Sequence, residues 1–126
     1  MKSIQIFTNN PAVREVYPGG VHWVEGDVRD VFTAVRDAVH IGARILSHPL
    51  SGSVKPWQSP YKTVVASTRR GKADFSSLGL IENALAAITR GVSKGTQFSQ
   101  ATLEDFQLID LELTQSATGL HTDGTQ

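Results

Sequence analysis

The residues best suited to chemistry lie in one polar stretch. It reads Ser47-His48-Pro49-Leu50-Ser51-Gly52-Ser53-Val54-Lys55. Hydroxyl and ammonium groups donate hydrogen bonds to oxygen anions, and a glycine lets successive backbone N–H groups form an anion-binding nest. His48 adds a side chain that exchanges a proton near neutral pH. The stretch therefore predicts a site for a phosphate, a carboxylate or a nucleotide.

The charge distribution is consistent with a local anion site and argues against a broad one. Lys+Arg 12 and Asp+Glu 12 give this chain of 126 residues a formal charge of +0, so we expect no general attraction to nucleic acid or to an anionic membrane. Residues 38–73 nevertheless hold six basic groups and no acid, while residues 95–126 hold five acids and no Lys or Arg. Chance and helix-end preferences give the same pattern without a site. The two segments could also pair within the fold or across a dimer.

The motifs that would specify a cofactor or a metal are missing from the sequence. The polar stretch lacks the spacing of a Walker motif, and no G-x-G-x-x-G is present, so we expect no dinucleotide and no other cofactor. The chain has no cysteine, which excludes thiolate zinc sites and thiol redox chemistry. No two of its four histidines have metal-ligand spacing, so no metal is expected. A proline-braced surface loop and a protein-docking surface remain alternative interpretations of residues 47–55.

Short strands and amphipathic helices alternate along the first two thirds of the chain. Apolar patterns predict strands at residues 4–7, 21–24, 44–46 and 63–66. Asn10 and Pro11 begin a short helix, Asp27 caps a helix with one apolar face that ends before Gly42, and Asp74 caps a third helix. The apolar stripe of the third helix is wide, which indicates burial on two sides or a dimer face.

This order predicts an α/β fold, a small Rossmann-like layered sandwich with a mostly parallel sheet of about four strands. In such sheets ligands bind beyond the carboxyl ends of the strands, where three polar turns would meet. The predicted ligand-binding residues are Thr8, Asn9, Asn10, Ser47, His48, Ser51, Gly52, Ser53, Lys55 and Arg69.

The C-terminal part allows two interpretations. Capping residues and apolar spacing favour a helix over residues 103–115, although residues 109–114 also alternate like a strand. We expect one domain over residues 1–115 and a flexible tail over residues 116–126. No apolar run approaches the ~20 residues that a membrane helix needs, and the N-terminus is unlike a signal peptide, so a cytoplasmic location is expected.

Several short blocks together resemble the GrdX family. They are Thr8-Asn9-Asn10-Pro11, the block from His48 to Pro56, Pro60-Tyr61-Lys62, Asp105-Phe106 and Ile109-Asp110. Members of this family are encoded beside the components of glycine, sarcosine and betaine reductase systems in anaerobic bacteria. The resemblance implies a context and brings no catalytic residues with it.

The resemblance leaves two functional hypotheses and does not decide whether the chain is an enzyme. The first is a non-catalytic accessory protein of a glycine-reductase-type system, with the reductase components as partners. Since that chemistry uses selenocysteine and thiols, a chain without cysteine is not expected to be a redox component of it. The second is a small-anion or nucleotide binding protein, or an enzyme, that uses the stretch at residues 47–55.

Overall fold

The computed structural model describes residues 3–50, 59–91 and 98–122. Its elements in chain order are β1 (Ile4–Thr8), α1 (Pro11–Val16), β2 (Val21–Trp23), α2 (Val28–His40), β3 (Thr63–Ser67), α3 (Phe75–Gly91) and α4 (Gln100–Thr122). The three strands form one mixed sheet in the order β2-β1-β3. β1 pairs with β2 in parallel and with β3 antiparallel.

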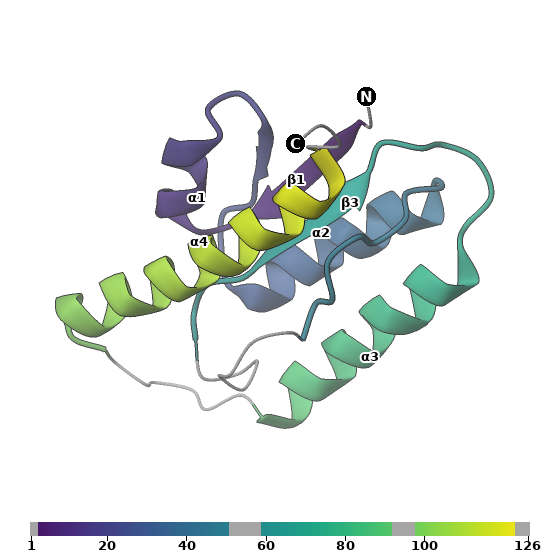
Figure 1. The fold of residues 1–126 in the computed structure, drawn as a ribbon. Helices are drawn as coiled ribbons and strands as arrows, with labels where there is room; N and C mark the ends of the chain where they lie inside the picture. The colour runs from purple at the N-terminus through teal and green to yellow at the C-terminus, as the bar shows by residue number, and fades with distance from the viewer. Residues whose placement is uncertain (1–2, 51–58, 92–97, 123–126) are drawn as a thin grey trace.

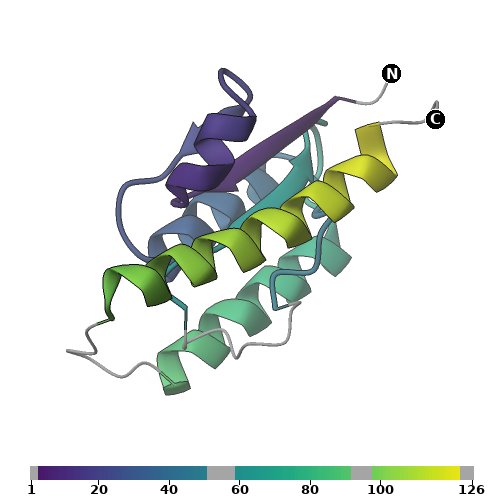
Figure 2. The ribbon, with the colours of Figure 1, turned by 60° about the vertical axis from the view of Figure 1, so that its left-hand side comes forward.

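The sheet is covered by helices on both faces (Figures 1 and 2). Alternate strand residues face opposite sides. Phe7 and Val64 pack with α2 and α3 on one side, whereas Ile6 and Val65 pack with Val13 of α1 and with α4 on the other. The fold is therefore a three-layer α/β domain in which α4 lies across β3 and beside α1.

The predicted Rossmann-like sheet of about four mostly parallel strands is wrong. Residues 44–46 make only an isolated antiparallel bridge, Ile45 to Ala66, and β3 runs against β1. A parallel return needs a crossover of a dozen or more residues, usually helical. Residues 47–61 have no helical periodicity, so the chain re-enters the sheet from the end at which it left and β3 is antiparallel.

The helix predictions, which depend on local signals, are confirmed. The Asn10 side chain accepts from the N–H of Ala12, and Asp27 and Asp30 form a reciprocal capping box at the start of α2. Asp74 accepts from the N–H of Ser77 at the start of α3. The wide apolar face of α3 packs against α2 within the chain.

The C-terminal segment is helical, as its apolar spacing favoured. The helix begins earlier than the predicted caps, at Gln100, and the Ser99 hydroxyl accepts from the N–H of Thr102 at 3.2 Å. α4 continues to Thr122, so residues 116–122, which we expected in the tail, belong to a helix. Thr118 within this part is buried, and its hydroxyl lies 2.8 Å from the Tyr17 hydroxyl. Among the residues that the structure describes, no helix is both long and apolar enough to cross a membrane.

Candidate functional site

The three polar turns do not meet at one edge of the sheet. In the antiparallel register Thr8 lies opposite Thr63, and Ile4 lies opposite Ser67. The turn that follows Ser67 is therefore at the opposite end of the sheet from residues 8–10. Arg69 in that turn donates from Nη1 to the carbonyl of Gly42 at 2.8 Å. The predicted convergence of Arg69 with Thr8, Asn9 and Asn10 is wrong because it assumed that all strands were parallel.

The predicted loop is described only at its start. Ser47 is partly buried, and its hydroxyl accepts from the N–H of Val65 at 2.9 Å. His48 is exposed, and its Nδ1 accepts from the N–H of Leu50 at 3.1 Å. Ser51, Gly52, Ser53 and Lys55 lie outside the described residues, so their part in an anion site stays a prediction.

Thr8 and Asn10 begin a buried chain of hydrogen bonds that ends on a carboxylate. The backbone N–H of Asn10 donates to Thr8 Oγ1 at 3.0 Å. The hydroxyls of Thr8 and Thr63 are 2.7 Å apart, and Thr63 Oγ1 donates to Asp110 Oδ2 at 2.6 Å. A backbone N–H can only donate and an ionised carboxylate can only accept. The donor and the acceptor of each of these hydrogen bonds are therefore determined, and Thr8 donates to Thr63.

The Asn10 amide ties this chain of hydrogen bonds to two helices. Its Oδ1 caps α1 by accepting from the N–H of Ala12 at 2.9 Å. Its Nδ2 donates to Asp110 Oδ2 and to the carbonyl of Gln107, both at 3.0 Å. Asn10 is fully buried, so its polar atoms serve the fold and do not face a ligand.

The Asn9 side chain also joins separate segments of the chain at this edge of the sheet. Its Nδ2 donates to the carbonyls of Gly26 at 3.0 Å and Pro60 at 2.8 Å. Its Oδ1 accepts from the N–H of Lys62 at 2.9 Å. Asn9 therefore fixes where the chain enters β3 and where the Lys62 side chain begins.

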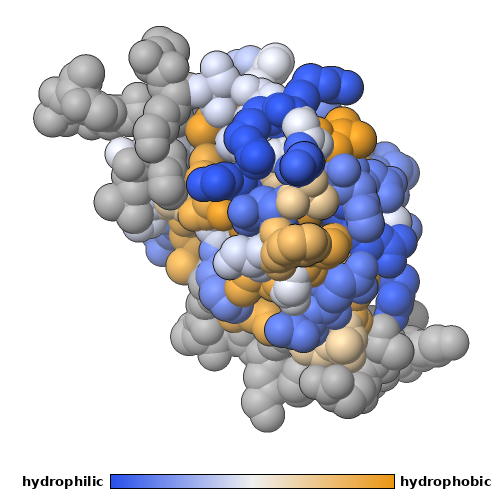
Figure 3. Space-filling model, turned by 90° about the vertical axis from the view of Figure 1, so that its right-hand side faces the viewer, coloured by the Kyte–Doolittle hydropathy of each residue, from blue (hydrophilic) through white to orange (hydrophobic). Residues whose placement is uncertain are grey.

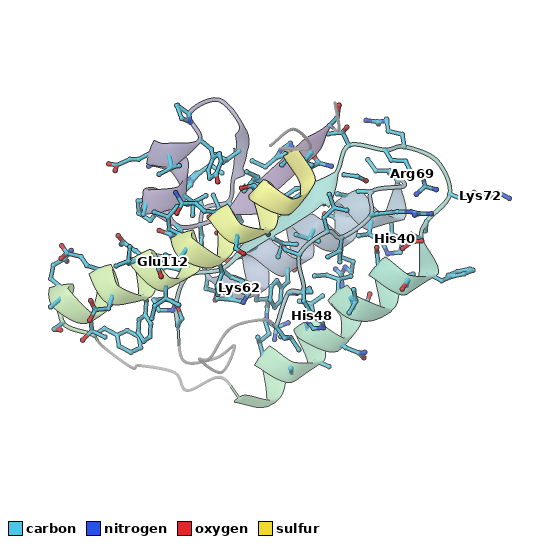
Figure 4. All side chains as sticks on the ribbon, viewed as in Figure 1. His40, His48, Lys62, Arg69, Lys72 and Glu112 are labelled. Atoms are coloured by element: carbon cyan, nitrogen blue, oxygen red, sulfur yellow. The ribbon has the colours of Figure 1, made fainter. Side chains whose placement is uncertain are left out.

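A small, partly open recess lies beside the buried carboxylate. It is lined by Ser47, Lys62, Thr63, Asp110, Leu113 and Thr114. Lys62 lies beneath α4 (Figure 4). The recess holds roughly one water-sized group, so it fits the end of a small molecule and not a whole nucleotide.

Burial changes the pKa of the Lys62 side chain at this recess. It lowers the pKa of the Lys62 ammonium below its ordinary value, and the negative charge of Asp110 opposes the shift. The Ser47 hydroxyl, which already accepts from the backbone, can direct its proton to a bound oxygen. Lys62 and Ser47 therefore offer donors to a carboxylate or phosphate oxygen, and Asp110 offers an acceptor to a donor on the same ligand.

The sequence prediction missed Lys62, Thr63, Asp110 and Thr114. One signal was present for Asp110, which shares a helix face with Phe106 and Leu113 at i−4 and i+3. A carboxylate on an apolar helix face must have a buried partner. Across residues 3–50, 59–91 and 98–122, no His, Cys, Asp and Glu side chains are grouped as a metal site requires.

These features define a class: a small three-layer α/β domain with a mixed sheet and a charged recess where α4 crosses the sheet edge. A family model described as GrdX-like protein matches residues 5–119. The chain therefore belongs to the GrdX-like family, and the resemblance seen in the sequence is confirmed. Comparisons with curated proteins and with solved structures found no match.

Proposed function

We propose that this GrdX-like protein is a cytoplasmic, non-catalytic accessory component of a glycine-reductase-type amino-acid fermentation system. It binds a small anionic metabolite at the recess formed by Ser47, Lys62 and Asp110. Family membership supports the context. The chain also has no cysteine with which to carry electrons or an acyl group as a thiolate.

The observation that carries the binding proposal is the partly buried Lys62 at the recess. A charged donor in such a place binds an anion more strongly than a solvated surface lysine does, because water screens it less. Asp110 lines the same recess, and hydrogen bonds from Thr63 and Asn10 hold its carboxylate in place. The anionic group is expected against Lys62 and Ser47.

Ligand binding is tested by thermal shift and calorimetry with inorganic phosphate, acetate, glycine and acetyl phosphate. At least one ligand should raise the melting temperature of the wild type. Lys62→Met should remove the shift. Lys72→Met is the matched control, because Lys72 is an exposed lysine in the turn after β3, and it should keep the shift. No shift with any ligand, or equal shifts in both variants, would contradict binding at the recess.

The accessory role has a separate test. The tagged chain, expressed in cells grown on glycine, should retain components of the reductase system through a wash at physiological salt. The Lys62→Met variant should retain the same components if the partner surface is distinct from the recess. Recovery of none of them by the wild type would count against physical association.

A second candidate function rests on the lowered pKa of Lys62. An amine with a larger neutral fraction near pH 7 is a better base or nucleophile than a solvated lysine. In that case the same recess would belong to an enzyme acting on a small anion. Turnover of acetyl phosphate by the wild type, lost in Lys62→Met and kept in Lys72→Met, would favour this function over the accessory one.

A further inference from the structure

A basic corner lies at the opposite end of β3 from the recess, where the turn after β3 meets the end of α2. The cations are Arg44, Arg69, Arg70 and Lys72, all of them exposed. Asp74 lies among them and pairs with Arg44 at 3.7 Å, so the surface keeps a net positive charge. The turn is pinned by the Gly71 N–H, which donates to the carbonyl of Ile41 at 2.9 Å, and by the bond from Arg69 to Gly42. We call this surface the basic corner.

The basic corner also carries two apolar side chains with no cover. Phe75 is 86% exposed and Ile41 is 51% exposed. Apolar side chains lie among hydrophilic ones on this side of the molecule (Figure 3). Exposed aromatic and aliphatic groups ringed by arginine are typical of the centre and rim of a protein interface.

The first half of α4 presents the complementary pattern. Leu108 is 52% exposed, and Asp105 and Glu112 flank it at i−3 and i+4. Glu104, one turn before Leu108, adds a third exposed acid. This acidic ridge therefore has an apolar centre and an anionic rim, whereas the basic corner has an apolar centre and a cationic rim.

The two surfaces cannot meet within one molecule. Arg69 and Lys72 lie at one side of the fold, and Glu112 lies toward the other (Figure 4). Lys62 and Asp110 bring one base and one acid of the two segments together at the recess. The charges of the basic corner and the acidic ridge do not meet in this way, and they are available to another molecule.

We propose that the chain associates with a second copy of itself, with the basic corner of one copy docked on the acidic ridge of the next. A second copy matches both surfaces at once, in charge and in apolar centre. A polyanion such as a nucleic acid would match the corner alone, and a chain with formal charge +0 has no broad field to attract it. This inference does not depend on the proposed function.

The contact joins unlike surfaces, which limits the assemblies it can build. It forms twice in a closed two-fold dimer, or once per subunit in a ring or an open filament. Because its rim is charged, salt should weaken the association.

The test is the mass in solution, measured by light scattering and sedimentation at about 100 μM chain. In low salt the wild type should have at least twice the chain mass of 13.6 kDa. Its mass should fall toward the monomer in ~0.5 M salt. Phe75→Ser should also lower the mass in low salt without a change of charge.

Charge reversal identifies the surfaces. Arg70→Glu with Lys72→Glu, and separately Asp105→Lys with Glu112→Lys, should each give a monomer. In an equimolar mixture, the reversed corner of the first variant is opposite in charge to the reversed ridge of the second. The unchanged corner of the second variant likewise matches the unchanged ridge of the first, so the mixture should associate. Glu82→Lys, an exposed residue on α3, is the control and should associate like the wild type.

Two results would overturn the proposal. A wild type that is monomeric at low salt excludes the second copy and leaves an acidic partner protein as the occupant of the corner. Double variants that fold, by circular dichroism, and still associate like the wild type show that another surface makes the contact.

Discussion

Replacing Thr63 by valine should destabilise the fold far more than its size suggests. Valine has nearly the same shape as threonine, so the substitution removes a hydroxyl with little change in packing. The hydroxyl donates to Asp110 at 2.6 Å and accepts from Thr8 across 2.7 Å. Both bonds are buried at the sheet edge beneath α4.

The magnitude follows from these two bonds. A hydrogen bond to a charged group contributes about 1.5–3 kcal/mol, and a buried hydroxyl left without an acceptor costs about 1–3 kcal/mol. Thr63→Val should therefore lower the free energy of unfolding by about 3–5 kcal/mol. Thr33→Val is the control, because Thr33 donates to the carbonyl of Arg29 at an exposed position on α2, and it should cost at most about 0.5 kcal/mol.

Urea unfolding gives the free energies, and a double-mutant cycle tests the chain of hydrogen bonds itself. Thr8→Val also breaks the bond between the two hydroxyls, so that bond is counted in both single variants. The double variant should then cost less than the sum of the singles by about 1 kcal/mol. Additive costs, or a Thr63→Val cost equal to that of Thr33→Val, would refute the proposed order of hydrogen bonds, in which Thr8 donates to Thr63 and Thr63 donates to Asp110.

Three further predictions concern charge and backbone. The pKa of Lys62 in the folded protein lies below 10.5, so between that pKa and pH 10.5 the unfolded chain binds more protons than the folded one. The stability of the wild type should therefore rise with pH across this window. Lys62→Met should flatten the rise, as measured by urea unfolding at a series of pH values. Hydrogen bonds from the hydroxyl and N–H of Ser77 lower the pKa of Asp74 below its ordinary 3.8, so its contribution should be present above that pH and be lost on acidification; the melting-temperature deficit of Asp74→Asn should shrink in acid. A Cβ on Gly42, at φ +117°, would overlap the backbone N of Gly71, whereas a Cβ on Gly71 would meet nothing within 4 Å. Gly42→Ala should therefore lower the free energy of unfolding, measured in urea, by at least about 2 kcal/mol more than Gly71→Ala does.

The helices were predictable because their causes are local. Asp27 and Asp30 are three residues apart, and Asn10 is next to Pro11, so a short window of sequence contains the whole capping motif. Apolar spacing then identified the buried face of α2. Even α4, whose sequence alternates in places like a strand, is helical as its apolar spacing favoured, although its cap is Ser99.

The sheet and the site were not predictable in the same way. The direction of β3 depends on how the chain returns after Ser47, and strand patterns do not encode direction. Thr8 and Asn10 have the residue types of a ligand site, but their partner, Asp110, is 100 residues from Asn10 in the chain. Buried hydrogen-bonding residues and ligand-binding residues have the same composition, so only the tertiary contact separates them.

The bond between Asn10 and Asp110 also bears on how the protein acquires its structure. Contacts between distant residues form slowly, because a long loop must close first. During synthesis the face of the sheet with Ile6 and Val65 is covered only by α1 until α4 has been made. When α4 docks, it buries that face and at the same time brings the Asp110 carboxylate within hydrogen-bond distance of the Thr63 hydroxyl. Amide protection along α4 and along this edge of the sheet should therefore appear together, as the last step of folding.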